Sequence, residues 1–135
     1  MTTFVTNHLK PYEALTSRLS SQPPESRGVG EHITRAIAAA GAAKIGILGR
    51  DEKRVQSARE KFTKEHPFTQ FLGYSADIID ETAIAIMLKD FSVPDVLTSN
   101  AGVFPDDGPF ISQDLKRWWL GFETNVLGTA VVTQK

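Results

Sequence analysis

Three short groups of glycine and amide residues carry the chemistry that this sequence could support. Ser26-Arg27-Gly28-Val29-Gly30 precedes an Ala-rich stretch with helical periodicity. Glycines at such a turn let a pyrophosphate approach the backbone amides at a helix N-terminus. Ser99-Asn100-Ala101-Gly102 follows an apolar segment, and Asn125 lies in a later helical stretch. Because paired glycines are also common in ordinary turns, the first group depends on its neighbours for its meaning.

Two further positions lie where predicted strands end. Arg50 follows the apolar segment 44–48. An arginine there can accept the 2′-phosphate of an adenosine ribose, whereas an acidic residue would bind the 2′-hydroxyl. The alternative is a solvated arginine beside a helix cap at Asp51. Asp77 and Ile78 follow the next strand, where an Asp is otherwise a common helix cap or turn former.

Helical and strand patterns alternate from Gly28 onward. Apolar spacing and candidate caps predict helices over 31–40, 51–65, 80–91 and 112–134. Short apolar runs predict strands over 44–48, 68–74 and 94–98. Strands separated by amphipathic helices imply right-handed crossovers. The sequence therefore predicts an α/β fold with a parallel sheet.

Composition excludes several classes of function. The net charge is −1, with 15 basic and 16 acidic residues, so we expect neither nucleic-acid nor membrane binding. The absence of cysteine excludes disulfides and thiolate metal sites. The three histidines have no metal-ligand spacing, and we expect no metal. With neither an apolar span nor a secretory signal in the sequence, a cytoplasmic location is the default expectation.

In their order and distances, the three groups resemble the N-terminal, cofactor-binding half of a short-chain dehydrogenase/reductase. The resemblance covers about residues 24–135 and implies a Rossmann-like three-layer parallel sheet, here incomplete. It implies NADP, with NAD less favoured, because Arg27 and Arg50 are basic. The implied cofactor-binding residues are Ser26, Arg27, Gly28, Gly30, Arg50, Asp77, Ile78, Asn100, Ala101 and Gly102, and the implied catalytic residue is Asn125, which supports the family's proton relay.

Three features depart from the family pattern. Pro23, Pro24 and Glu25 occupy the start of the glycine turn, where a locked φ and a carboxylate oppose phosphate binding. Neither tyrosine is followed four residues later by a lysine, so the Tyr-x-x-x-Lys pair of the family is missing before the chain ends. Ser99 replaces the first Asn of the family's Asn-Asn-Ala-Gly segment.

The first strand of the family's sheet is also expected to be missing. It would lie between the strands matching 44–48 and 94–98, but segment 16–22 is too polar for a strand buried on both faces. We therefore divide the chain into an N-terminal arm or linker, 1–27, and a partial NAD(P)-binding Rossmann domain, 28–135. The segment from Thr2 to Asn7 is a candidate substitute strand.

Three hypotheses of function follow from these features. The first is a truncated short-chain dehydrogenase/reductase-like protein, related to NADP-dependent oxidoreductases acting on carbonyl or alcohol groups and inactive alone. The second is a non-catalytic module that binds a nucleotide, or pairs with a second copy or a full-length homologue through helix 112–134. The third is a non-functional product of a damaged or mis-spliced gene. The genomic sequence around Gln22-Pro23 and past Lys135 would discriminate among them.

Overall fold

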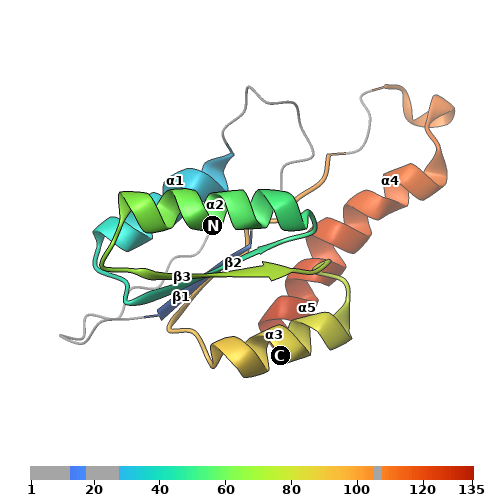
Figure 1. The fold of residues 1–135 in the computed structure, drawn as a ribbon. Coiled ribbons are helices and arrows are strands. Elements are labelled where there is room, and N and C mark those ends of the chain that lie inside the picture. The colour runs from blue at the N-terminus through green and yellow to red at the C-terminus, as the bar shows by residue number, and fades with distance from the viewer. Residues whose placement is uncertain (1–12, 18–27, 105–107) are drawn as a thin grey trace.

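The protein, seen here as a computed structural model that describes residues 13–17, 28–104 and 108–135, contains one four-stranded sheet (Figure 1). All the strand pairs are parallel, and the spatial order is β3-β2-β1-β4. Parallel neighbours require crossover connections, which the helices between β2, β3 and β4 supply. The predicted α/β fold with a parallel sheet is confirmed. The strands are β1 (Glu13–Ser17), β2 (Lys44–Gly49), β3 (Gln70–Ser75) and β4 (Val96–Thr98).

The prediction that the first strand is missing is wrong. β1 lies inside the sheet, with Leu15 opposite Gly46 of β2 on one side and opposite Leu97 of β4 on the other. Its backbone is paired on both sides although its sequence is Glu-Ala-Leu-Thr-Ser, because position in a sheet overrides strand propensity. β1 belongs to segment 1–27, which the sequence predicts as an arm. The proposed substitute strand from Thr2 to Asn7 lies outside the described residues.

Three helices follow the predicted pattern closely. They are α1 (Val29–Ala39), α2 (Glu52–Glu65) and α3 (Glu81–Phe91). Asp51 caps α2 by accepting a hydrogen bond from the Arg54 amide, and Asp80 caps α3 through the amides of Thr82 and Ala83. Both caps satisfy donors that lack an intrahelical partner.

The predicted continuous helix 112–134 is wrong in its detail. Ser112 ends a short 3₁₀ turn, and the helix begins later, where Asp114 caps it by accepting from the Lys116 amide. A π-helical segment then interrupts it near its middle. The observed elements are η1 (Phe110–Ser112), α4 (Leu115–Phe122), the π segment η2 (Glu123–Gly128) and α5 (Thr129–Gln134).

Helices cover the two faces of the sheet, which makes three layers. Figure 1 shows α1 and α2 on one side of the sheet and α3 and α5 on the other. The first face packs Ile45 and Ile47 against Phe62 of α2, and the second packs Leu48 against Ile84 and Phe91 of α3. Consecutive strand residues point to opposite faces, so β2 contributes to both cores.

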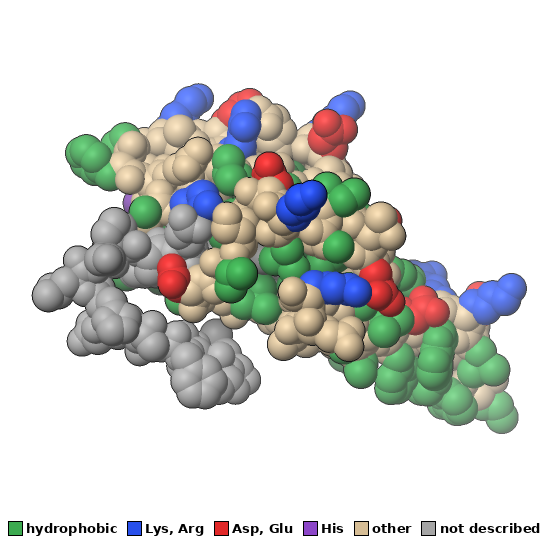
Figure 2. Space-filling model, turned by 90° about the horizontal axis from the view of Figure 1, so that it is seen from below, with side chains coloured by type: hydrophobic (Ala, Val, Ile, Leu, Met, Phe, Trp, Pro, Cys, Tyr) green, Lys and Arg blue, Asp and Glu red, His purple; other side chains and the backbone are tan. Residues whose placement is uncertain are grey.

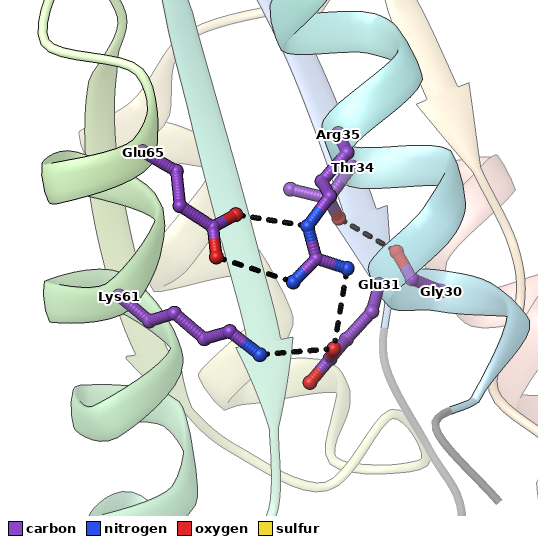
Figure 3. Close-up of polar contacts among 6 residues, drawn as sticks. All are labelled: Gly30, Glu31, Thr34, Arg35, Lys61 and Glu65. Atoms are coloured by element: carbon purple, nitrogen blue, oxygen red, sulfur yellow. Dashed lines mark hydrogen bonds and ion pairs between the residues drawn. The ribbon is translucent and has the colours of Figure 1, made fainter.

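A polar network joins α1 to α2 above the first core (Figure 3). Glu31, which is only 8% exposed, pairs with Arg35 at 3.4 Å and with Lys61 at 3.3 Å. Arg35 also donates to both carboxylate oxygens of Glu65, at 2.8 and 3.3 Å, and lies 5.4 Å from the Phe62 ring centroid. These hydrogen bonds lower the pKa of the Glu65 carboxyl. The pair therefore stabilises the fold above the unfolded-state pKa of Glu65 and loses that effect as the pH falls through the folded-state pKa.

Candidate functional site

The carboxyl ends of the four strands meet at one edge of the sheet, because all the strands run in the same direction. From β1 the chain moves outward to β2 and β3, then returns to place β4 on the other side of β1. Ligands of open α/β sheets bind at such a reversal of strand order. Arg50 follows β2 directly, and Asp77 and Asn100 lie two residues beyond the ends of β3 and β4. Gly28 precedes the helix that leads from β1 to β2.

The helix terminus at this edge is suited to an anion. Gly28 is the N-cap of α1, with φ −61° and ψ 150°, and its carbonyl accepts a hydrogen bond from the Glu31 amide at 2.9 Å. A glycine cap offers no side-chain acceptor to the first helical amides, which point along the helix axis towards the edge. Gly30 is buried in the first turn. Ser26 and Arg27 lie outside the described residues.

Arg50 and Asp77 are brought together from two neighbouring strand ends. Arg50 Nη1 lies 3.7 Å from Asp77 Oδ2, and both side chains are about one third exposed, at 38% and 34%. Ser75 Oγ donates to the Arg50 carbonyl at 3.3 Å. Asp51 pairs instead with Arg54, at 3.3 Å. Arg50 therefore pairs with Asp77 rather than with the Asp51 cap, and its contact with a cofactor stays a prediction.

Ile78 lies in the core rather than on the open edge. Its side chain belongs to the second core cluster, and the residue is 3% exposed. It packs directly on Gly128 of η2, where an added Cβ would overlap the Ile78 Cγ1 and Cδ1 atoms. Contact between Ile78 and a cofactor therefore stays a prediction, while its packing role is direct.

Asn125 holds the segment after β4. Its Oδ1 accepts from the Val103 amide at 2.8 Å, and its Nδ2 donates to the Val103 carbonyl at 2.9 Å. The carboxamide thus pairs with one residue as a neighbouring strand would. Gly102 lies beside it, since a Cβ there would be 3.5 Å from Oδ1. Asn100 and Ala101 are half-buried, and Ala101 packs against the second core.

The sequence prediction missed Thr129. Its hydroxyl donates to the Asn125 carbonyl at 3.0 Å, and its Oγ1 lies 3.2 Å from Ser99 Oγ. The four-residue spacing between Asn125 and Thr129 was the available signal, because residues at i and i+4 share a helix face. Assuming one regular helix over 112–134 concealed the π segment between them.

In residues 13–17, 28–104 and 108–135, no three His, Cys, Asp or Glu side chains gather in a way that could hold a metal ion. Within the same ranges, no helix has the length and apolar character needed to cross a membrane.

Comparison of the sequence with known proteins identifies the family to which it is related. A profile described as short chain dehydrogenase matches residues 25–135. Short chain dehydrogenase mpl6 of Monascus purpureus and short chain dehydrogenase citE of Monascus ruber are each 30% identical over 118 residues. Those alignments cover 81% of this chain and 40% of each relative. The chain therefore spans less than half the length of the curated relatives that it matches.

Solved structures agree in fold. A 3-oxoacyl-[acyl-carrier protein] reductase with bound NAD from Brucella melitensis superposes with a TM-score of 0.77 at 20% identity, covering 93% of this chain and 47% of that one. L-sorbose reductase from Gluconobacter frateurii, complexed with NADPH and L-sorbose, gives 0.75 at 18% identity, covering 93% and 46%. At these identities the likeness concerns the Rossmann-like fold alone. Because the family profile spans residues 25–135 and the sheet has the matching architecture, the chain belongs to the short chain dehydrogenase family.

Proposed function

We propose that this chain is the cofactor-binding half of an NADP-dependent oxidoreductase acting on carbonyl or alcohol groups. The observation that carries the proposal is the convergence at one sheet edge of the Gly28 helix terminus, the Arg50–Asp77 pair and the segment held by Asn125. A helix N-terminus suits a pyrophosphate, and a guanidinium suits a 2′-phosphate. A bound nicotinamide would supply hydride transfer. Solved proteins of the same fold are described with NAD or NADPH.

The preference for NADP over NAD rests on Arg50. Its ion pair with Asp77 is long and partly exposed, so exchanging that partner for a phosphate costs little. The carbonyl contact from Ser75 ties the backbone of Arg50 to the end of β3. The guanidinium itself reaches Asp77 beyond the end of β3, which supports a place for the adenosine ribose at this edge.

Arg50→Ala is expected to weaken NADPH binding by about fivefold, because a partly exposed charge contact contributes about 1 kcal/mol. NADH affinity should change by less than about twofold, which is under about 0.5 kcal/mol. Isothermal titration with both cofactors measures this. Arg59→Ala is the matched control, since it removes the same charge from the middle of α2. Equal affinity for both cofactors that persists in Arg50→Ala would contradict the assignment.

Pairing of the chain with a second copy or a homologue is a second candidate function. Leu115, Trp119, Phe122 and Val126 are large apolar residues at 44–61% exposure along α4 and η2. Figure 2 shows apolar side chains gathered at the right-hand end of the molecule, where α4 lies. An exposed apolar surface of this kind is typical of an interface. Light scattering should give a dimer mass that Trp119→Lys reduces to a monomer mass, and a monomer before substitution would contradict pairing between copies of this chain.

A further inference from the structure

Three oxygen atoms form a continuous series between the end of β4 and the π segment. Thr129 Oγ1 lies 3.0 Å from the Asn125 carbonyl oxygen and 3.2 Å from Ser99 Oγ. A hydroxyl has one proton to donate. Since the carbonyl can only accept, the Thr129 proton goes to Asn125, and Ser99 is the donor to Thr129 Oγ1. The direction of the series is therefore fixed as Ser99 to Thr129 to Asn125.

The π segment places Asn125 and Thr129 where both can form these hydrogen bonds. η2 runs from Glu123 to Gly128 and ends directly before Thr129. Short π-helical segments inside α-helices recur at functional sites. Here the side-chain amide of Asn125 reaches Val103, while the backbone carbonyl of the same residue receives the Thr129 hydroxyl. One residue of the π segment is thus held through both its side chain and its backbone.

Hydrogen bonds therefore hold both ends of segment 99–103, which follows β4. Ser99 is hydrogen-bonded to the hydroxyl of Thr129, and the backbone of Val103 forms two hydrogen bonds with the Asn125 carboxamide, at 2.8 and 2.9 Å. Between them lies 100–102, which the proposed function places against the cofactor. The short Ser99 side chain, which stands where the resemblance would put an amide, fits a partner hydroxyl at this distance.

We propose that Thr129 is a positioning residue for the cofactor-binding segment 100–102. It acts by fixing Ser99 and the Asn125 backbone relative to one another, and it makes no contact with the cofactor itself. The proposal rests on the proposed function, because it assigns a role in holding the same site. Nothing in the role requires the proton relay of a complete enzyme.

Thr129→Val removes the hydroxyl and keeps the β-branched shape. The Val103 amide donates to Asn125, so its hydrogen–deuterium exchange rate reports directly how firmly this end of the segment is held. We expect that exchange to accelerate by about three- to tenfold and NADPH affinity to fall by a similar factor, as expected for one net hydrogen bond. Thr129→Ser should retain both values. Thr133→Val is the control, since it removes a hydroxyl bound to the Thr129 carbonyl one turn further along.

The outcomes separate this proposal from the proposed function. If the unsubstituted chain binds no NADPH, the proposed function fails. The exchange rate of the Val103 amide in Thr129→Val then still tests whether Thr129 holds the segment. If it binds NADPH and Thr129→Val leaves the affinity unchanged, the positioning role is overturned. An equal loss in Thr133→Val also overturns it. Should Thr129→Val fail to fold, Thr129→Ala compared with Thr129→Ser provides the same test.

Discussion

A polypeptide of these 135 residues is expected to reduce no ketone or aldehyde above the no-protein rate, with either NADPH or NADH. Proton transfer by a positioned side chain contributes about 10²- to 10⁴-fold to catalysis. The resemblance assigns that step to a Tyr-x-x-x-Lys pair, but the residues four places after Tyr12 and Tyr74 are Thr16 and Ile78. Spectrophotometric assay of cofactor oxidation over a panel of carbonyl compounds measures the rate.

Tyr74 does not replace the missing acid. Its hydroxyl donates to Asp90 Oδ2 at 2.8 Å, and its ring packs edge-on against Phe91 of α3. Burial, together with the hydrogen bond to Asp90, raises the pKa of Tyr74, whereas a proton donor at neutral pH needs a lowered one. Tyr74→Phe is therefore expected to leave the rate at background. Turnover by the unsubstituted chain that disappears in Asn125→Ala would contradict the expectation.

Gly128→Ala is expected to destabilise the fold by about 1–3 kcal/mol, the cost of overpacking a core. In an exposed helix the same change would stabilise by about 0.5–1 kcal/mol, because glycine is a poor helix former. Here the added Cβ would overlap Ile78, whose side chain is buried in the second core and would have to shift against its neighbours. Urea unfolding followed by circular dichroism measures the free energy of unfolding.

A second substitution separates overlap from helix propensity. Ile78→Ala removes Cγ1 and Cδ1, the two atoms that the new methyl group would overlap, so Gly128→Ala made in that background should cost less than it does alone. Ala130→Gly, at an exposed position of α5, gives the propensity effect in the opposite direction. A stabilising Gly128→Ala, equal and opposite to Ala130→Gly, would show that Ile78 does not constrain the glycine.

Local signals explain the parts of the fold that the sequence predicts. Asp51 and Asp80 begin helices because an aspartate cap depends only on the next few residues. Val55, Ala58 and Phe62 lie three or four residues apart and are all buried, as expected for one apolar face of a helix. The parallel sheet follows from the alternation of these helices with apolar strands.

Tertiary context explains the parts that it does not predict. β1 is central although polar in sequence, because its place is set by pairing with β2 and β4 rather than by its own apolar pattern. On α1, Ile37 packs against the first core and Ile33 is half-buried, whereas Ala40 is exposed. Glu31 and Thr34 are buried as well, because ion pairs and a hydrogen bond to the Gly30 carbonyl compensate them.

The candidate site likewise has features that the sequence predicts and features that depend on tertiary context. Strand ends predict that Arg50 and Asp77 lie at one edge, since parallel strands align their carboxyl ends. The pairing of Asn125 with Val103 depends on the π segment, for which the periodicity gave no sign. Ile78 follows a strand as a site residue would, yet the close approach of Gly128 encloses it.

Titration of the ¹⁵N-labelled chain with NADPH, followed residue by residue in amide spectra, tests the cofactor site most directly. A cofactor site at the carboxyl edge of the sheet predicts changes in the amide chemical shifts of Gly28, Arg50 and Gly102. It predicts none at Lys44 or Gln70, which begin β2 and β3 at the opposite edge. Shifts confined to Lys44 and Gln70, or no shift at a saturating NADPH concentration, would contradict a nicotinamide site at the carboxyl edge of this sheet.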